Sequence, residues 1–464
     1  PNTTAMLRTA ATLLLATSSW AYDNGAPHSR KPPLGWSSWV ALGPDAASDA
    51  AKAPIFDFCD EASVLASIDA FVSVGLYKAG YRHFHLDDCW ADLERNATGY
   101  LQAERDHFPR GMKPIVDYAH FKGLTFGLYT CAGTKTCVGG RPGSKDHWTQ
   151  DANVFASWGV DVVKMDWCNT QGMEPADTYP LMSAALNATG RHIHLNMCEW
   201  GRDDPWEWGP KVAQSWRATG DHTPVWESTK EIIAQRTAVP PSLGGAPYAW
   251  NDMDMLETGN YAQAAHANGK QGTMSAVEYK TEFSMWAVLA SPLVVTTPIL
   301  NCSATDQIGG NFTPSKCVPS LTPLQKEILL NAEAIAVNQD VTPAGRLLAA
   351  PAAPLCPGTT EASTAAAAMV YARNLSDGSV AVALYNPSDA AADGSVEFAQ
   401  LGWSATATAE VRDLWAHASR GAATGRYPDA ASCGAVSVGA HETVLLRLTP
   451  QKKTEEAAAV EEEA

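Results

Sequence analysis

The sequence predicts an α/β protein in which a (β/α)8 TIM barrel is followed by a C-terminal antiparallel β domain. Four observations lead to this fold class. From Pro33 to about Asp340, short apolar runs alternate with helical patterns, which is the order of repeated βα units. Nearly every run ends in carboxylates, Trp, Cys or Arg, and beyond Asp340 the helical patterns give way to short strand-like runs. A chain of 464 residues accommodates a barrel of roughly 250 residues and one further domain.

Eight segments have the character of strands, and a barrel of this kind requires eight. In chain order they are PPLGWSSW, HFHLDDCW, TFGLYTC, VDVVKMDWC, HIHLNMCEW, SWRATGD, YAWNDMDML and VLASPLVVTT. Their polar ends would gather at the C-terminal face of the barrel, where barrel active sites lie. A doubly wound open sheet also places its sites at strand ends and is the structural alternative.

The first helix is expected between residues 60 and 80. Asp60 can cap its N-terminus, and Gly80 stands where a glycine ends a helix. Apolar residues recur between them with the helical period. They are Val64, Leu65, Ile68, Phe71, Val72 and Leu76.

Beyond Asp340 the alternating runs AMVYARN, VAVALYN, TAEVRDLW and TVLLRLTP predict the antiparallel β domain. Arg8 followed by ATLLLATSSWA has the basic and apolar parts of a signal peptide, and the mature chain would begin between Tyr22 and Lys31. The last residues are charged and poor in large apolar groups, which is typical of disorder. The expected divisions are a signal peptide region at 1–25, the barrel at 26–340, the β domain at 341–450 and a disordered acidic tail at 451–464.

The net charge of −17 and the sequence pI near 5.1 argue against nucleic acid or an anionic membrane as a partner. No run of about 18 apolar residues follows the signal segment, so the mature protein is expected to be soluble, as a monomer or a homodimer. Its expected location is the secretory pathway, with the cell exterior, cell wall, vacuole or lysosome as destination. Sequons, which support secretion only weakly, occur at Asn2, Asn96, Asn187, Asn301, Asn311 and Asn374.

Ten cysteines in a chain of the secretory route favour disulfide bridges over metal binding. Four pairs are expected, two of them near the candidate site and two as local bridges of later regions. They are Cys59 with Cys89, Cys137 with Cys168, Cys302 with Cys317, and Cys356 with Cys433. Cys131 and Cys198 remain, either free or bonded to each other.

Lys164 and Asp166 lie two residues apart on one strand, so their side chains point to the same side. A neighbouring cation favours the ionised carboxylate, the form that a nucleophile needs. A structural salt bridge is the alternative reading of this pair.

Asp221 supplies a second carboxylate at another strand end. Glycoside hydrolysis with retention needs two carboxyl groups about 5–5.5 Å apart, one as nucleophile and one as proton carrier. The proton carrier must begin protonated, and a touching guanidinium would lower its pKa. Arg217 is therefore expected to contact sugar hydroxyls or to point away from the oxygen of Asp221 that carries the proton.

Asp87 and Asp88 are consecutive at a strand end, where both can reach a ligand and accept sugar hydroxyls. With His83 and His85 they could instead form a metal cluster. Asp252 and Asp254 form another pair on one face, with Met255 as an apolar neighbour, although Asp252 could simply cap a turn.

Taken in order, eight segments resemble the α-galactosidases of glycoside hydrolase family 27, the melibiase family, and are most similar to plant and algal members. They are PPLGWSSW, HLDDCW, GLTFGLYTCAGTKTC, WGVDVVKMDWC, CEWG, SWRATGD, WNDMDMLETGN and NAEAIAVNQD. The resemblance runs from Pro32 through most of the later domain, where VRDLW and HETVLLRLTP resemble the family's C-terminal β-sandwich.

The resemblance implies a retaining α-galactosidase that removes terminal α-D-galactose from oligosaccharides, polysaccharides or glycoconjugates without a cofactor or metal. It makes Asp166 the nucleophile and Asp221 the acid/base, with Cys137 and Cys168 as the family disulfide beside the nucleophile. The implied substrate-binding residues are Trp39, Asp87, Asp88, Tyr129, Cys137, Lys164, Cys198, Trp200, Arg217, Asp254 and Met255.

The sequence departs from the family pattern at several positions. Ser37 and Val40 replace asparagines, Met253 replaces a proline, and Trp167 follows the nucleophile where a small or polar residue is common. The segments 45–57 and 262–270 are also longer than usual. None of these changes removes a catalytic group, but they bear on the range of substrates.

Three other functions remain as alternatives. An α-N-acetylgalactosaminidase needs small residues around the sugar's 2-position, and Glu199 and Trp200 are large. A β-L-arabinopyranosidase of the same family would differ in what surrounds the 6-hydroxymethyl group near Asp87. A non-catalytic galactose-binding protein would be expected to lack Asp166 or Asp221, and both are present.

Overall fold

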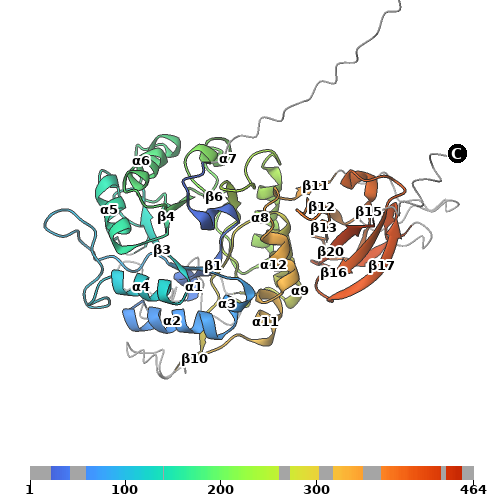
Figure 1. Cartoon of the computed structure of the whole chain (residues 1–464), viewed down its shortest axis with the longest axis horizontal. Coiled ribbons are helices and arrows are strands. Elements are labelled where there is room, and N and C mark those ends of the chain that lie inside the picture. Colours follow the sequence, from blue (N-terminus) through green and yellow to red (C-terminus); the bar gives the residue numbers. More distant parts are fainter. Residues whose placement is uncertain are drawn as a thin grey trace, which may run out of the picture.

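The computed structural model describes residues 22–41, 59–138, 140–260, 272–301, 317–348, 367–429 and 435–451. These residues form a barrel and a separate antiparallel β domain, which lie side by side (Figure 1). The predicted signal segment up to residue 21, the acidic tail from residue 452 and the segments 45–57 and 262–270 fall outside them.

The barrel contains one sheet of eight parallel strands in the order β7-β6-β5-β4-β3-β2-β1-β8. Each strand falls within one of the eight predicted segments. β1 pairs with both β2 and β8, and a parallel bridge from Leu256, just after β7, to Val295 completes the ring, so an open doubly wound sheet is wrong. The strands are β1 (Leu34–Ser37), β2 (His83–Leu86), β3 (Thr125–Cys131), β4 (Val162–Asp166), β5 (His194–Cys198), β6 (Ser215–Arg217), β7 (Trp250–Asp252) and β8 (Leu293–Val295).

Helices occupy the connections between the strands and continue after the last one. In chain order they are α1 (Ser38–Ala41), α2 (Glu61–Ser73), α3 (Leu76–Ala79), α4 (Lys113–Phe121), α5 (Trp148–Trp158), α6 (Pro175–Ala188), α7 (Pro205–Trp208), α8 (Trp226–Ala238), α9 (Ala276–Val288), α11 (Pro323–Leu329) and α12 (Ala332–Asn338). The first predicted helix is in fact two, α2 and α3. Asp60 caps α2 as expected by accepting a 2.7 Å hydrogen bond from the Ser63 amide, but Gly75, with φ of 101°, breaks the helical path before α3.

Alternation along the strands decides which side chains enter the barrel. On β4, Val163 and Met165 are fully buried in the core outside the sheet, whereas Lys164 lines the interior cavity with residues of other strands. His83 and His85 of β2 also face inward. A Cβ atom at Gly127 of β3 would lie 2.5 Å from Nδ1 of His85, so only glycine leaves room for these imidazoles. The interior is therefore more polar than that of most barrels, which hold branched apolar residues.

The later domain has a sheet of six strands in the order β11-β12-β13-β20-β16-β17, and all of its pairings are antiparallel. All four predicted runs form strands of this sheet. They are β12 (Met369–Asn374), β13 (Val380–Tyr385), β16 (Thr408–Asp413) and β20 (Thr443–Pro450), joined by β11 (Arg346–Leu347) and β17 (Ala418–Thr424). Short pairs add β9 (Leu300–Asn301) with β10 (Val318–Pro319), β14 (Ala392–Gly394) with β19 (Val436–Val438), and β15 (Val396–Glu397) with β18 (Arg426–Tyr427).

The two faces of this sheet belong to different cores. Along β13, Ala381, Ala383 and Tyr385 join the core that continues into the barrel, while Val382 and Leu384 join a second core within the β domain. Figure 1 shows α9 and α12 between the barrel strands and this sheet. Because side chains alternate along each strand, one face of this sheet packs toward the barrel, where α9 lies, and the other face packs within the β domain.

Two of the predicted disulfides, Cys59–Cys89 and Cys137–Cys168, are present. Cys131 and Cys198 are buried free thiols and are not bonded to each other. Cys317 is also disulfide-bonded, but its expected partner Cys302, and the expected pair Cys356 and Cys433, lie outside the described residues.

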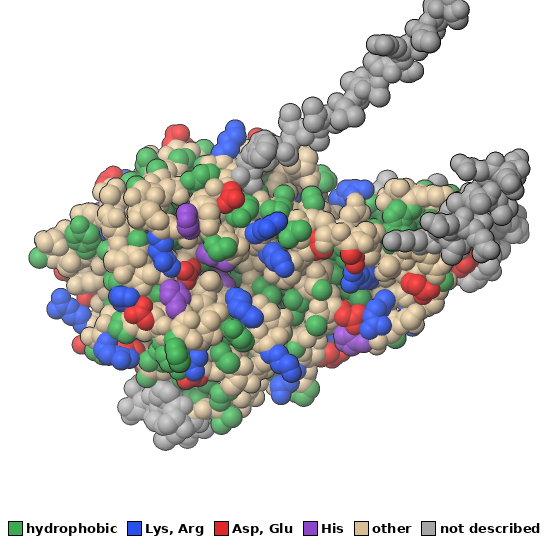
Figure 2. Space-filling model, in the orientation of Figure 1, with side chains coloured by type: hydrophobic (Ala, Val, Ile, Leu, Met, Phe, Trp, Pro, Cys, Tyr) green, Lys and Arg blue, Asp and Glu red, His purple; other side chains and the backbone are tan. Residues whose placement is uncertain are grey.

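Figure 2 shows acidic and basic side chains interspersed over one face of both domains. On this face the net negative charge of the chain is not collected into a single acidic area. Within the ranges that the structure describes, no helix has both the length and the apolar character needed to cross a membrane.

Candidate active site

The predicted site residues all lie at the C-terminal ends of the barrel strands or in the connections that follow. This is the face at which barrel enzymes bind their substrates. From β1 to β7 they are Trp39, Asp87 and Asp88, Tyr129 and Cys137, Lys164 and Asp166, Cys198 and Trp200, Arg217 and Asp221, and Asp254 and Met255. A cavity lined by Lys164, Arg217, Asp254 and Met255 extends from this face toward His83 and His194 inside the barrel.

Asp166 is the last residue of β4 and is buried, with 7% of its surface exposed. Oδ1 accepts a 2.9 Å hydrogen bond from the Trp167 amide, and Oδ2 accepts a 3.0 Å hydrogen bond from the Tyr129 hydroxyl. Burial raises the pKa of Asp166 above its usual value, and the Lys164 ammonium opposes this shift. The Lys164 ammonium thus favours the ionised form of Asp166, as expected, but desolvation outweighs this effect.

The ammonium of Lys164 lies 2.8 Å from Oδ2 of Asp87, which directly follows β2. Nε2 of His85 approaches the same oxygen at 3.4 Å. Burial would raise the pKa of Asp87, but Lys164 and His85 together hold it well below its usual range. Asp87 is therefore an anion in the pocket and can accept hydrogen bonds from a ligand.

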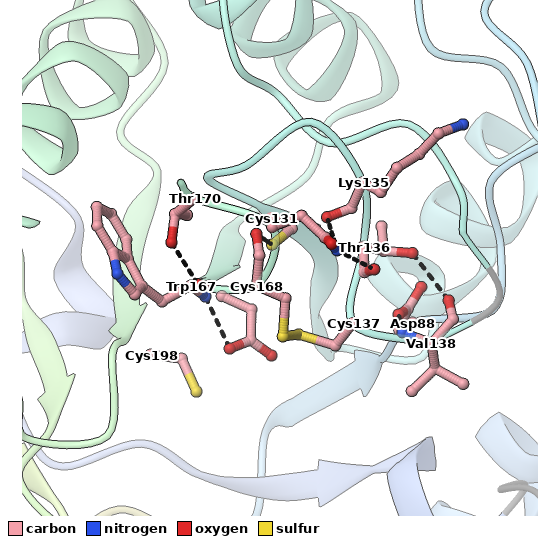
Figure 3. Close-up of a disulfide and its surroundings, with 12 residues drawn as sticks. Asp88, Cys131, Lys135, Thr136, Cys137, Val138, Trp167, Cys168, Thr170 and Cys198 are labelled. Atoms are coloured by element: carbon pink, nitrogen blue, oxygen red, sulfur yellow. Dashed lines mark hydrogen bonds between the residues drawn. A yellow bond between two sulfur atoms is a disulfide. The ribbon is translucent and has the colours of Figure 1, made fainter. Parts of the chain in front are cut away.

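Asp88 has a different environment from its neighbour. Its Oδ2 accepts a 2.9 Å hydrogen bond from the Val138 amide, directly after the Cys137–Cys168 disulfide. Figure 3 shows this disulfide between Asp88 and Cys198. Burial raises the pKa of Asp88 to about 7, although the Val138 amide opposes the shift. At weakly acidic pH, Asp87 is therefore ionised while its neighbour Asp88 is mostly protonated.

Asp221 follows β6, and its side chain is 51% exposed. Nη2 of Arg217 lies 2.9 Å from its Oδ1, and Nη1 of Arg217 lies 3.0 Å from Oδ1 of Asp254. Arg217 therefore contacts Asp221 directly, at one of its two carboxylate oxygens.

Asp252 and Asp254 play different parts. Oδ1 of Asp252 accepts a 2.9 Å hydrogen bond from the Asp254 amide, so Asp252 caps the turn, as in the simpler interpretation. Asp254 has φ of 76° and contacts Arg217. Burial raises the pKa of Asp254, while Arg217 opposes the shift.

Apolar and sulfur groups complete the pocket. Trp39 and Tyr129 lie on the ammonium of Lys164, with 5.8 Å and 5.4 Å between the nitrogen and the ring centroids. Sγ of Cys198 lies 3.6 Å from Nη1 of Arg217. Trp200 has φ of 59° and remains partly exposed.

Two of the departures from the family pattern have local explanations. The indole of Trp167 stacks on Tyr179 with ring centroids 5.2 Å apart and points away from the disulfide in Figure 3. The Met253 amide donates a 2.9 Å hydrogen bond to Oγ of Ser291, which a proline could not do. Ser37 is fully buried, and the side chain of Val40 lies outside the described structure.

The metal alternative at His83, His85, Asp87 and Asp88 receives no geometric support. Among the described residues, the three potential metal ligands whose donor atoms lie within 4.8 Å of one another are Cys137, Asp166 and Cys168. The two cysteines are bonded to each other and offer no thiolate.

Sequence reasoning missed several polar residues around the site. His85 was considered only as a metal ligand, although its spacing of two from Asp87 indicates a shared face. His222, which follows Asp221, pairs with Glu282 of α9 at 2.9 Å. No local pattern connects residues 60 positions apart, so only the folded chain reveals this pair.

The comparisons with known proteins agree with this geometry. Residues 31–309 match the family profile described as "Alpha galactosidase A", and residues 366–448 match "Alpha galactosidase C-terminal beta sandwich domain". The chain is 36% identical over 420 residues to an alpha-galactosidase of Coffea arabica, which covers 90% of this chain and 94% of that protein. For an alpha-galactosidase of Cyamopsis tetragonoloba, the identity is 34% and the coverage is 90% and 86%.

The solved structures give the same result. Alpha-galactosidase I from Mortierella vinacea superposes with a TM-score of 0.72 at 29% identity, covering 91% of this chain and 98% of that one. The later domain therefore corresponds to the family's β-sandwich. Because the barrel profile matches more than half of the chain and the relatives cover most of it, this protein belongs to the alpha-galactosidase (melibiase) family.

Proposed function

We propose that this protein is a retaining glycoside hydrolase that removes terminal α-linked galactose by double displacement. Asp166 is the nucleophile and Asp221 is the acid/base. The observation that carries this proposal is the contrast between the two carboxyl groups of one pocket. Asp166 is buried and held by two hydrogen bonds, whereas Asp221 is half-exposed and close enough for its charge to raise the pKa of Asp166.

In the first step, a carboxylate oxygen of Asp166 attacks the anomeric carbon, and the bond from that carbon to the leaving oxygen breaks. Asp221 donates its proton to the leaving oxygen, so the aglycone departs as a neutral alcohol. The sugar remains attached to Asp166 as an ester. The Tyr129 hydroxyl and the Trp167 amide orient the carboxylate for this attack.

In the second step, Asp221, now ionised, removes a proton from water. The resulting oxygen attacks the anomeric carbon and displaces the carboxylate of Asp166. Two inversions leave galactose with the α configuration of the substrate. Asp221 has regained its proton, and Asp166 is again a carboxylate.

The remaining polar groups suit the hydroxyls of a bound galactose. Asp87 is held as an anion by Lys164, and Asp88 can donate or accept according to its protonation. Arg217 and Asp254 form a charged pair on the opposite side of the barrel. We assign these residues, with Trp39, Cys137, Cys198, Trp200 and Met255 at the pocket edge, to substrate binding.

The test is the release of p-nitrophenol from the α-galactoside by wild type, Asp166→Asn and Asp221→Asn, with NMR observation of the anomer formed first. Wild type should release α-galactose, and each variant should be nearly inactive. Asp106→Asn, which changes an exposed carboxylate, is the matched control and should keep full activity. Release of β-galactose would overturn the retaining mechanism.

Two further substrates address the alternatives. Cleavage of the α-N-acetylgalactosaminide or the β-arabinopyranoside in place of the α-galactoside would keep the two carboxylate roles and reject the assigned sugar. Binding of galactose with no hydrolysis of any substrate would instead favour the non-catalytic binding protein.

We also propose that the protein travels through the secretory pathway. The Cys59–Cys89 and Cys137–Cys168 disulfides are consistent with an oxidising compartment. The expected result for a tagged full chain expressed in a eukaryotic cell is loss of the first 21 to 30 residues, as predicted from the sequence, and recovery outside the cytosol. Recovery of the uncleaved chain from the cytosol would contradict it.

A further inference from the structure

A buried histidine lies directly behind the half-exposed carboxylate of Asp221. The side chain of His222 is fully buried, and its Nε2 lies 2.9 Å from Oε1 of Glu282. Its Nδ1 lies 3.1 Å from Oγ of Ser228, and its ring packs on Trp286 with centroids 5.2 Å apart. The residue that follows Asp221 is therefore anchored on every polar atom of its side chain.

Glu282 extends this anchor to a second loop. It belongs to α9, and its side chain is fully buried. Oε1 also accepts a 2.8 Å hydrogen bond from the Glu257 amide, and Oε2 accepts a 3.1 Å hydrogen bond from Oγ1 of Thr258. Glu257 and Thr258 lie in the loop after β7, which carries Asp254. One carboxylate thus connects the loop after β6 with the loop after β7.

A second connection joins the same loops nearer the pocket. The His222 amide donates a 2.8 Å hydrogen bond to Oδ2 of Asp254. Oδ1 of Asp254 contacts Arg217, and Arg217 contacts Asp221. The contacts therefore form a closed ring that runs from Asp221 through Arg217 and Asp254 to His222.

Exposure separates Asp221 from the other members of this ring. The side chains of His222, Arg217 and Asp254 are 0%, 4% and 10% exposed, while that of Asp221 is 51% exposed. A half-exposed carboxylate has little packing to hold it, so its position depends on the backbone that carries it. That backbone is anchored at the next residue, His222.

We propose that the buried His222–Glu282 pair is a positioning device for the acid/base. It clamps the loop that carries Asp221 to the loop that carries Asp254 and so fixes the direction of the Asp221 carboxyl group. This inference rests on the proposed role of Asp221. Burying such a pair contributes little net stability compared with apolar residues of similar size, so a gain in position explains it better than a gain in stability.

The test separates proton donation from the rest of the reaction. An alkyl α-galactoside, such as the methyl glycoside, needs its leaving oxygen protonated, whereas a 2,4-dinitrophenyl α-galactoside does not. The variants are His222→Phe and the double change His222→Phe with Glu282→Met. The double variant removes both partners, so no unpaired charge remains buried to unfold the protein.

We expect kcat/KM for the alkyl galactoside to fall by about 10–100-fold more than kcat/KM for the dinitrophenyl galactoside, since general acid catalysis contributes at least this much. KM for the dinitrophenyl substrate should change little. An equal fall on both substrates would overturn the proposal, because a loss of folded protein or of general packing does not depend on the leaving group.

Glu278→Gln is the matched control. Glu278 lies one turn earlier on α9 and accepts hydrogen bonds from the Ser275 amide at 2.6 Å and from Nδ1 of His441 at 2.7 Å. These partners lie outside residues 218–224 and 253–260, the two segments that the His222–Glu282 pair is proposed to hold. Its replacement should lower the melting temperature and leave the ratio of the two kcat/KM values unchanged.

Hydrogen exchange provides a readout that does not depend on activity. Backbone amides in residues 218–224 and 253–260 should exchange faster in the double variant than in wild type, and Glu278→Gln should not have this effect. Unchanged exchange in both segments would overturn the clamp. If wild type cleaves neither substrate, the proposed function fails, and the exchange rates still decide whether the pair holds the loops.

Discussion

The hydroxyl of Tyr129 donates a 3.0 Å hydrogen bond to Oδ2 of Asp166, which ties the assigned nucleophile on β4 to the neighbouring strand β3. Burial raises the pKa of Asp166. A donor that binds the ionised form works against this shift and keeps the carboxylate available for attack.

Tyr129→Phe should lower kcat by about 10–100-fold, because a hydrogen bond to a charged group contributes about 1.5–3 kcal/mol. The acidic limb of kcat/KM against pH should move to higher pH, since loss of the donor raises the pKa of Asp166 further. Tyr179→Phe is the control, because that buried hydroxyl donates to the Met165 carbonyl and not to Asp166. An unmoved acidic limb in Tyr129→Phe would show that the two residues are not coupled.

Because of the buried carboxyl group of Glu199, we expect the free energy of unfolding to fall as the pH rises. Glu199 is fully buried, and burial raises its pKa from 4.5 to about 8. The folded protein therefore keeps a proton that the unfolded chain loses, and the free energy of unfolding decreases between pH 4.5 and about 8. Above this pH range, Glu199 causes no further decrease in the free energy of unfolding.

In Glu199→Gln, the difference between the free energies of unfolding at the two ends of this pH range should be smaller than in wild type by roughly 2–5 kcal/mol. Urea unfolding at both pH values measures this difference. Glu231→Gln, an exposed position on α8, should leave the pH dependence as it is in wild type. A Glu199→Gln variant with the wild-type slope would mean that Glu199 ionises inside the folded protein without cost.

The Cys137–Cys168 disulfide should affect both stability and substrate binding. It closes a loop of 31 residues, and Cys137→Ser with Cys168→Ser should lower the free energy of unfolding by about 3–4 kcal/mol. The loop also holds the Val138 amide against Asp88, so KM for the α-galactoside should rise. Urea unfolding and steady-state kinetics measure the two effects, and a reduced stability with unchanged KM would limit the disulfide to a structural role.

Cys131 and Cys198 should resist alkylation in the native protein. Both thiols are buried, and burial raises the pKa of each above its usual value. The thiolate is the reactive form, so iodoacetamide at pH 8 should label neither residue until the chain is unfolded. Mass spectrometry of peptides from native and unfolded samples measures the labelling, and rapid native modification of either residue would contradict its burial.

The barrel was predictable because its signals are local. Each of the eight strands falls within a predicted apolar segment, and the segment TFGLYTC coincides with β3. The positions of Asp87, Asp166 and Arg217 at strand ends followed from the same segments. The resemblance to the family supplied the assignment of roles, which spacing alone does not provide.

Several expectations differed where the outcome depends on distant residues. Lys164 pairs with Asp87, directly after β2, and not with the carboxylate two positions along its own strand. Trp167, which departs from the family pattern next to Asp166, stacks on Tyr179 of α6. In each case the residue that the side chain contacts is determined by the folded barrel and not by its neighbours in the sequence.

The sequence by itself determined the strand and helix segments, the face on which the polar residues gather and the alternation of inward and outward side chains. These properties depend on periods of a few residues and on end-capping groups. Tertiary structure decided which charges meet, as in Lys164 with Asp87 and His222 with Glu282, and which carboxyl groups are desolvated. The reason is that both the partner of a charge and its burial are set by strands and helices that are neighbours in space but far apart along the chain.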